Sequence, residues 1–348
     1  MTARGNALII HGGGLVDPSR FVLMRIAHNL DNFQVYEKVF IGKYSFESLY
    51  KPEFWTQYNW HLVEKLKNKR GTYFGTSRGI NLTDPVLSNK AISCLKERNV
   101  TTVIVAGGDG SSRQVAEIND TFMKNGINII FAIPLTMDGI NGGMSIGLEQ
   151  AVRESIRQIE NIASASLETR DNEKFGVVIV ELQGRNRDDV IANVLQAFCR
   201  KKRVADCDFE NLFLRVVPAN IETDEEKLVE EINNSSKRTL ILVSEGANVS
   251  IPKLKEKINR KVRSLIVGHP SQSNGMTSKE DEYKYGLWMD KITSIIMQHI
   301  GESFCIVKNG EIFYKSSINY YAKLNPRNGQ KPEISEDLIN LMKSYMEM

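Results

Sequence analysis

The residues best suited to chemistry lie in a glycine-rich turn, Ala106-Gly-Gly-Asp-Gly-Ser-Ser112. This turn follows the apolar run 101–106 and precedes a segment of helical period. Glycines let backbone N–H groups approach a phosphate closely, and the start of a helix favours negative charge. Asp109 would repel a bare phosphate, but it suits a Mg²⁺ ion carried by a nucleotide. The turn therefore predicts a magnesium–nucleotide site, with a plain strand-to-helix turn as the alternative.

A second polar turn, residues 134–143, follows the apolar run 127–133. It carries Thr136 and Asp138 where we expect the next strand to end. A carboxylate at that edge of a sheet can accept the proton of a hydroxyl that attacks a phosphoryl group. The alternative is that Asp138 and Gly139 form an ordinary turn dipeptide.

Two weaker glycine turns lie at residues 12–14 and 71–78. A lone glycine triplet such as the first is more often a tight turn. Arg78, which ends the second, is by default an exposed surface arginine. Four phosphate-compatible turns at strand ends together indicate binding of a nucleotide or polyphosphate.

A polar and basic set follows later in the chain, at Gly184, Arg185, Glu245, Arg263 and His269. Arginine and histidine suit a sugar phosphate, and glutamate suits sugar hydroxyls. For His269 taken alone, a structural histidine at a strand end is the alternative.

The elements that would position these residues alternate between short apolar runs and segments of helical period. The runs are typical of strands buried on both faces of a parallel sheet, and lie at 7–11, 101–106, 127–133, 177–180, 239–243 and 264–267. Helices are predicted over 85–99 and 144–166 and from 223 onward. This order predicts an α/β fold of two Rossmann-like lobes with mainly parallel sheets. We expect a nucleotide-binding lobe over 1–140, an acceptor-binding lobe over 141–305 and a segment crossing back over 306–348.

Composition narrows the class of protein further. The 348 residues are 41% hydrophobic and 25% charged, and 45 Lys+Arg against 42 Asp+Glu leave a net charge of +3. This balance argues against a nucleic-acid partner or a polybasic membrane anchor. No apolar run approaches the roughly 20 residues that span a bilayer. The start lacks the features of a signal peptide, and the four cysteines have no CxxC spacing, so we expect a cytoplasmic protein.

The sequence resembles the 6-phosphofructokinases, in order, from about Leu8 to about Cys305. Residues 90–111 are similar to the family's helix, strand and GGDGS turn. Three further stretches look like its GT-hydrophobic-LGSxR, EVMGR and later sugar-phosphate motifs: 71–78, 181–185, and 243–246 with 267–269.

The resemblance implies Mg²⁺ and ATP as metal and phosphoryl donor. The resemblance also implies that Gly13 and Arg78 contact the nucleotide phosphates and that Asp109 holds Mg²⁺. Asp138 is the general base, with Thr136 beside it, while Arg78 and Arg185 offset charge on the transferred group. The remaining residues that line the nucleotide site are Gly108, Gly110 and Ser111.

The resemblance also implies how a sugar acceptor is held. Gly184, Arg185 and Glu245 bind the sugar, and Arg263 and His269 bind its phosphate. The family takes this arginine from a neighbouring subunit, which implies a homo-oligomer, either a dimer or a tetramer.

Two features bear on the phosphoryl donor. In the family, a glycine after the GGD aspartate goes with ATP, whereas pyrophosphate-dependent members usually carry a second aspartate there and a lysine in their PKTID motif. Here these positions are Gly110 and Leu135, and both favour ATP.

Several positions depart from the family pattern. The Asn-Asp pair that normally follows the base is replaced by Gly139 and Ile140, and two phosphate-binding arginines fall on Gly176 and Gln272. A hydrogen bond to a charged group contributes roughly 1.5–3 kcal/mol, so two losses would weaken fructose 6-phosphate binding severely. We therefore hypothesise ATP-dependent phosphorylation of a changed acceptor, either another sugar phosphate or an unphosphorylated sugar or nucleoside.

Two alternatives remain open. One is ordinary fructose-6-phosphate 1-kinase activity in glycolysis, with Lys174 compensating for a lost arginine. The other is a non-catalytic regulatory paralogue that binds nucleotide or sugar phosphate. Retention of both Asp109 and Asp138 argues against the second alternative.

Overall fold

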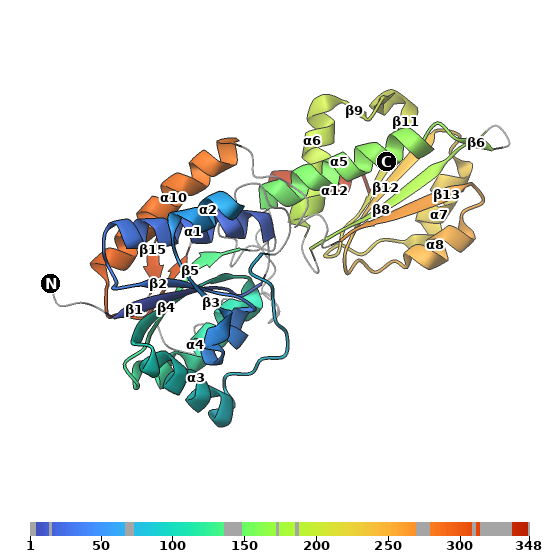
Figure 1. Cartoon of the computed structure of the whole chain (residues 1–348). Helices are drawn as coiled ribbons and strands as arrows, with labels where there is room; N and C mark the ends of the chain where they lie inside the picture. Colours follow the sequence, from blue (N-terminus) through green and yellow to red (C-terminus); the bar gives the residue numbers. More distant parts are fainter. Residues whose placement is uncertain are drawn as a thin grey trace. The chain divides into compact units, whose positions relative to one another are not determined.

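The structure, a computed structural model, describes residues 5–13, 16–66, 73–135, 148–171, 174–184, 188–268, 279–307, 311–313 and 336–346. The chain divides into two compact units, shown in Figure 1. The first unit comprises Met1–Gly147 and Gln272–Gln330, and the second comprises Leu148–Ser271 and Lys331–Met348. No helix within the described ranges is long and apolar enough to cross a membrane.

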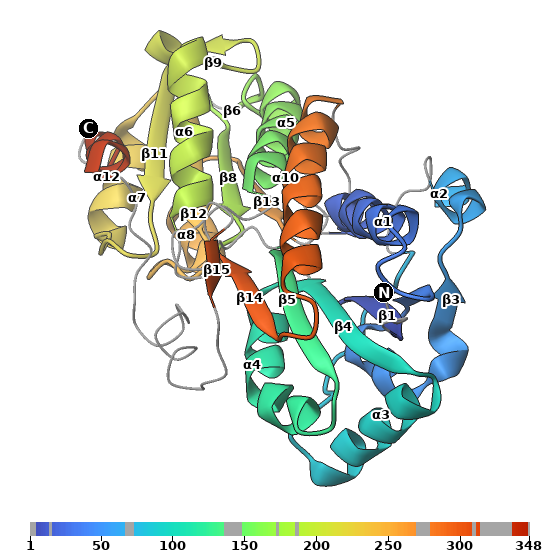
Figure 2. The same cartoon turned by 90° about the vertical axis from the view of Figure 1, so that its left-hand side faces the viewer.

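A seven-stranded sheet in the order β15-β14-β5-β4-β1-β2-β3 forms the centre of the first unit. Its strands are β1 (Asn6–His11), β2 (Val39–Gly42), β3 (Trp55–Gln57), β4 (Val100–Gly107), β5 (Asn128–Pro134), β14 (Phe304–Val307) and β15 (Glu311–Phe313). The five inner strands are parallel, and the edge strands β3 and β15 are antiparallel to their neighbours. Figure 2 shows β14 beside β5.

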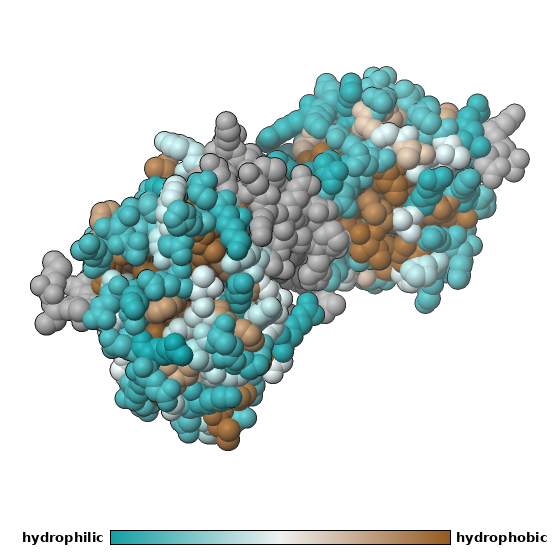
Figure 3. All heavy atoms as spheres, viewed as in Figure 1, coloured by the Kyte–Doolittle hydropathy of each residue, from teal (hydrophilic) through white to brown (hydrophobic). Residues whose placement is uncertain are grey.

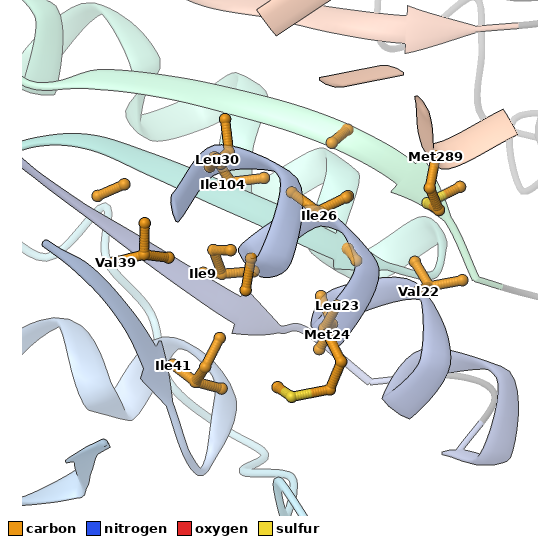
Figure 4. Packing of buried hydrophobic residues seen from close by; sticks show 14 of the residues in the cluster. Ile9, Val22, Leu23, Met24, Ile26, Leu30, Val39, Ile41, Ile104 and Met289 are labelled. Atoms are coloured by element: carbon orange, nitrogen blue, oxygen red, sulfur yellow. The ribbon is translucent and has the colours of Figure 1, made fainter. Parts of the chain in front are cut away.

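Helices cover both faces of this sheet. They are α1 (Val16–Asn32), α2 (Trp60–Leu66), α3 (Pro85–Glu97), α4 (Asp109–Met123) and α10 (Lys279–Gln298), with 3-10 turns at η1 (Ser45–Tyr50) and η2 (Pro52–Phe54). Because side chains alternate along a strand, Ile9 of β1 packs under α1 and α10, whereas Ile10 packs under α3 and α4. Figure 4 shows the cluster between α1 and the sheet. Both faces of β1 are therefore buried, as its apolar run predicts.

The second unit is built on a parallel four-stranded sheet in the order β11-β12-β8-β13. These strands are β8 (Val177–Leu182), β11 (Leu212–Val217), β12 (Arg238–Ser244) and β13 (Val262–Val267). Its helices are α5 (Leu148–Ser166), α6 (Asp189–Lys201), α7 (Glu225–Asn234), α8 (Ile251–Lys257) and α12 (Glu336–Ser344). Short elements complete it: hairpins β6 (Arg170–Asp171) with β7 (Lys174–Phe175) and β9 (Arg203–Val204) with β10 (Cys207–Asp208), and η3 (Phe209–Asn211). Helices α7 and α8 pack on one face of the sheet, and α5 and α6 lie on the other (Figure 1).

The predicted division of the chain needs correction. The expected acceptor lobe, 141–305, includes α10 and β14, but both belong to the first unit. Arg25 of α1 donates two hydrogen bonds of 2.9 Å to Asp290 of α10, and Asn29 donates a third of 2.8 Å to Asp290. The chain therefore returns to the first unit near residue 272 and to the second near residue 331.

The prediction that strand 264–267 is buried on both faces is also wrong. β13 lies at the edge of its sheet, where only β8 pairs with it among the described strands. Arg263, Ser264 and Ile266 are consequently exposed, and Ile266 has a relative exposure of 65%.

Arg260 fastens the amino ends of the second unit's strands. Its guanidinium, with the residue 8% exposed, donates to the backbone oxygens of Phe175 and Lys237, which precede β8 and β12. It also donates to Ile232 and Ser235 at the end of α7, at 3.0 and 3.1 Å, and to the hydroxyl of Thr239 at 2.9 Å. One buried cation thus satisfies the carbonyls of several segments at once.

We expect Arg260→Met to lower the free energy of unfolding by about 3 kcal/mol or more, because it leaves several carbonyl oxygens without their donor. Urea denaturation measures this loss. Arg263→Met is the matched control, since this exposed arginine lies three residues further on and should change stability by less than about 0.5 kcal/mol. Equal losses in the two variants would contradict the assignment.

Candidate functional site

Two glycine turns meet at the carboxyl ends of β1 and β4. The strands are parallel neighbours with His11 opposite Ala106, so Gly12 and Gly13 lie beside Gly107 and Gly108. After β1 the chain continues to β2 on one side, and after β4 it continues to β5 on the other. Connections that leave in opposite directions open a crevice between the strand ends, which is where open α/β sheets bind ligands.

Ser111 locks these two turns together. Its hydroxyl donates a 2.6 Å hydrogen bond to the carbonyl oxygen of Gly12, and the residue is 4% exposed. A Cβ atom would lie 2.2 Å from this hydroxyl at Gly12 and 2.6 Å from it at Gly107. Both positions therefore require glycine. Within the described structure, Ser111 contacts the glycine turn and is closed to solvent.

The start of α4 is open within the described part of the chain. No heavy atom of the described residues lies within 4 Å of a Cβ atom placed on Gly13 or on Gly110. Gly13 has a φ of 110°, which L side chains rarely adopt, and Gly108 precedes the helix without a capping side chain. Backbone N–H groups at a helix start facing free space form a cradle that fits a phosphate. Asp109 begins α4, but its side chain lies outside the described part, and a carboxylate there has the chemistry to bind Mg²⁺.

The segment that carries Arg78 is anchored to the end of β2. Ser77 donates a 2.6 Å hydrogen bond to the carbonyl of Tyr44, and the N–H of Tyr44 donates to Phe74 at 2.7 Å. Gly75 has a φ of 60°, and a Cβ on it would lie 2.7 Å from the Tyr44 ring. The Tyr44 ring itself is 42% exposed.

The same segment is tied to α4. Gln114, in the second turn of α4, donates a 2.7 Å hydrogen bond to the carbonyl of Ile80. Arg78, two residues earlier, is exposed. The structure therefore ties the segment that carries Arg78 both to Tyr44, after β2, and to the second turn of α4. The sequence analysis missed Tyr44; the available signal was an aromatic residue two positions after the short apolar segment 39–42, which forms β2.

Thr136 and Asp138 lie outside the described residues. Directly before them, the N–H of Leu135 donates a 2.8 Å hydrogen bond to the carbonyl of Gly107. The chain thus passes the glycine turn immediately before residue 136.

The second unit brings Gly184 and Glu245 together at the carboxyl edge of its sheet. Glu245 follows β12, and its N–H donates to Leu182 at 2.8 Å. Its side-chain Oε2 accepts a 3.3 Å hydrogen bond from the N–H of Gly184, which follows β8. Arg185 and His269 come directly after described residues, but lie outside them.

Glu181 is a further carboxylate near this edge. Burial and the charge of Glu245 raise the pKa of Glu181. Two glutamates on adjacent strands offer hydrogen-bond acceptors for hydroxyl groups. The sequence analysis identified Glu181 only as part of a motif, because its proximity to Glu245 depends on strand register.

Arg263 does not join this group within one chain. It lies near the amino end of β13, five residues before Gly268, and at about 3.3 Å per residue this separates them by roughly 16 Å. Arg263 is also exposed.

Gly176 has no room for a side chain. A Cβ there would lie 2.8 Å from the backbone oxygen of Ser166. Lys174, the nearby basic residue, donates a 2.8 Å hydrogen bond to the carbonyl of Asn233 in the last turn of α7. Neither residue, as the structure has them, presents a cation at the carboxyl edge.

Parallel sheets with a glycine cradle at a switch point define the class of nucleotide-binding α/β proteins. Residues 7–284 match the phosphofructokinase family, and the chain belongs to that family. This confirms the family predicted from the sequence motifs.

The relatives are distant. The ATP-dependent 6-phosphofructokinase of Mannheimia succiniciproducens is 22% identical over 61% of this chain and 62% of its own length. That of Buchnera aphidicola is 26% identical over 70% of this chain and 69% of its own. The chain thus spans less than two thirds of the first relative's length.

Solved structures confirm the predicted fold class. Phosphofructokinase from Pichia pastoris superposes with a TM-score of 0.73 at 17% identity, covering 99% of this chain and 42% of that one. A pyrophosphate-dependent phosphofructokinase from Marinobacter aquaeolei superposes with a TM-score of 0.69 at 15% identity, and the match covers 98% of this chain and 91% of that one.

Proposed function

We propose that this protein transfers a phosphoryl group from Mg²⁺-ATP to a hydroxyl of a sugar or sugar phosphate. The observation that carries the proposal is the open cradle formed by Gly13 and Gly110 at the switch point between β1 and β4. Family membership supports phosphoryl transfer as its use. We expect the protein to act in the cytoplasm.

The proposed mechanism is a direct in-line transfer. The glycine turns, with Gly108, hold the nucleotide phosphates. Ser111, expected from the sequence to line the site, is buried and instead fixes the turn through Gly12. Asp138 accepts the proton of the attacking hydroxyl, and Thr136 lies beside it. Arg78 and Arg185 offset charge on the transferred group. Asp109 would hold Mg²⁺, which when bound neutralises phosphate charge. No side chain is assigned as a nucleophile, so no covalent intermediate is expected.

ATP is the proposed donor. Gly110 leaves the space that an α-phosphate needs, and Leu135 stands where pyrophosphate-dependent members carry lysine. The exposed Tyr44 ring offers a stacking face for a nucleobase, a group that pyrophosphate lacks. The curated relatives are named ATP-dependent, although two similar solved structures are of pyrophosphate-dependent phosphofructokinases.

The proposed acceptor differs from fructose 6-phosphate. Gly184, Arg185 and Glu245 would hold the sugar, but arginines are missing at Gly176 and Gln272. The closed space at Gly176 and the engagement of Lys174 with α7 support this change. They also argue against compensation by Lys174.

Restoring arginine at position 176 tests this interpretation. We expect Gly176→Arg to destabilise the protein by about 1–3 kcal/mol, since the new Cβ clashes with backbone, and not to improve activity with fructose 6-phosphate. Gln272→Arg restores the other lost charge and should lower the KM for fructose 6-phosphate. A stable Gly176→Arg protein with raised kcat/KM would contradict the interpretation.

A homo-oligomer, dimer or tetramer, is proposed to complete the acceptor site. Arg263 is exposed and too far from Gly268 to serve the same chain, so it and His269 would bind acceptor phosphate across an interface. Figure 3 shows an apolar area open on the second unit, over its sheet, and the exposed Ile266 lies on the edge strand β13. Sedimentation velocity that detects only monomer would contradict this proposal.

The test of function is ADP formation by the purified protein with Mg²⁺-ATP across sugars and sugar phosphates, with pyrophosphate as a parallel donor. Acceptor-dependent ADP formation supports the proposal. Nucleotide binding without turnover on any acceptor would favour the regulatory alternative. Turnover centred on fructose 6-phosphate would favour the ordinary glycolytic kinase.

A further inference from the structure

A buried carboxylate connects three loops of the second unit. Asp188, 1% exposed, lies between Gly184 and the start of α6. Its Oδ1 accepts hydrogen bonds from the Ser244 hydroxyl at 2.7 Å and the Ala219 N–H at 2.8 Å. Its Oδ2 accepts from the N–H of Asn220 at 3.2 Å and from the Asn220 side chain at 3.1 Å. Four donors offset the desolvation of this carboxylate.

These contacts lie at the carboxyl edge of the sheet, where β8, β11 and β12 end (Figure 1). Ser244 directly precedes Glu245, whose side chain accepts from the N–H of Gly184. The Asp188 carboxylate therefore holds Ser244, the residue directly before Glu245. Asp188 itself lies four residues after Gly184.

We propose that Asp188 is the positioning residue of the acceptor site: it holds the loop of Glu245 against the loop of Gly184 so that both meet the sugar. This inference rests on the proposed function, which assigns Gly184 and Glu245 to the acceptor. Asp188 touches neither acceptor nor nucleotide in this role, and acts through the hydrogen bond to Ser244.

Asp188→Asn is the sharpest variant. It keeps the shape but replaces one carboxylate oxygen by an NH₂ group, so the backbone N–H of either Ala219 or Asn220 loses its acceptor. Arg260→Lys is the matched control, because Arg260 fastens the amino ends of the strands in the same unit, opposite the acceptor edge. Both variants should be destabilised.

Two readouts are needed. The first is steady-state kinetics with Mg²⁺-ATP and either fructose 6-phosphate or fructose. For Asp188→Asn we expect about a tenfold rise in the KM of whichever acceptor is used, with kcat changed less than about threefold, since ground-state and transition-state binding weaken together. The second is amide hydrogen exchange without ligand, which should accelerate at residues 219–223 and 244–249. Arg260→Lys should leave the KM unchanged and accelerate exchange near residues 232–239.

An unchanged acceptor KM in Asp188→Asn, or an equal rise in Arg260→Lys, would overturn the inference. If the wild-type protein turns over neither acceptor, the acceptor is not one of these two probes, and ADP formation across the wider panel tests the proposed function separately. Hydrogen exchange then decides alone: faster exchange around Glu245 only in Asp188→Asn supports the positioning role, and unchanged exchange there rejects it.

Discussion

Asp138→Asn is expected to lower kcat by about 10²–10⁴-fold, the range that a positioned general base contributes. The amide keeps the size of the side chain but cannot accept a proton from the acceptor hydroxyl. ATP affinity should change little, because the proposed phosphate contacts come from the glycine turns and Arg78. Initial rates of ADP formation and equilibrium binding of Mg²⁺-ATP measure the two effects separately.

The control for Asp138→Asn is Asp206→Asn. Asp206 lies between β9 and β10 with its side chain 95% exposed, so it loses the same charge at a surface site. Its kcat should match that of the wild type. Full activity of Asp138→Asn would remove Asp138 from the mechanism, whereas an inactive wild type that binds ATP would support a regulatory protein.

Gly110→Asp should raise the KM for ATP by roughly a hundredfold, because like charges about 4 Å apart near a protein surface repel by about 4 kcal/mol before further screening. The space that Gly110 leaves open would receive a carboxylate where an α-phosphate is proposed to lie. Pyrophosphate has no α-phosphate ester, so any activity with pyrophosphate should fall much less. Parallel KM measurements with the two donors check this difference.

Gly110→Ala separates the effect of the added charge on ATP binding from the effect of the added side-chain volume. A methyl group at this position meets no atom of the described residues within 4 Å. Alanine also has a higher helix propensity than glycine, so the folded protein should be at least as stable. Its KM for ATP should rise less than that of Gly110→Asp. Equal KM values for ATP in Gly110→Asp and the wild type would show that no nucleotide phosphate approaches this turn.

Local patterns predicted much of the fold. The apolar runs 101–106 and 127–133 correspond to β4 and β5, and the helix predicted over 85–99 corresponds to α3, which Asp84 caps with proline in its first turn. The cap at Asp224 likewise precedes α7. These features depend on residues close in sequence, so periodicity and capping chemistry are enough to find them.

Features that join distant segments could not be predicted in this way. Asp290 and Arg25, which place α10 in the first unit, are separated by 265 positions. Asp188 meets Ser244 across 56 positions, and Arg260 meets Phe175 across 85. No sequence spacing indicates such pairs, since folding alone brings them together. The paired turns of Gly12 and Gly107 were identified as separate motifs, and only the sheet order makes them one cradle.

The most direct single measurement is kcat/KM for fructose 6-phosphate with saturating Mg²⁺-ATP, set against the best other acceptor. If the lost arginines have changed the acceptor, the value for fructose 6-phosphate falls below about 10⁴ M⁻¹s⁻¹ while another sugar or sugar phosphate exceeds it. A value at or above that level for fructose 6-phosphate, with no better acceptor, would contradict a changed specificity and make this an ordinary fructose-6-phosphate kinase.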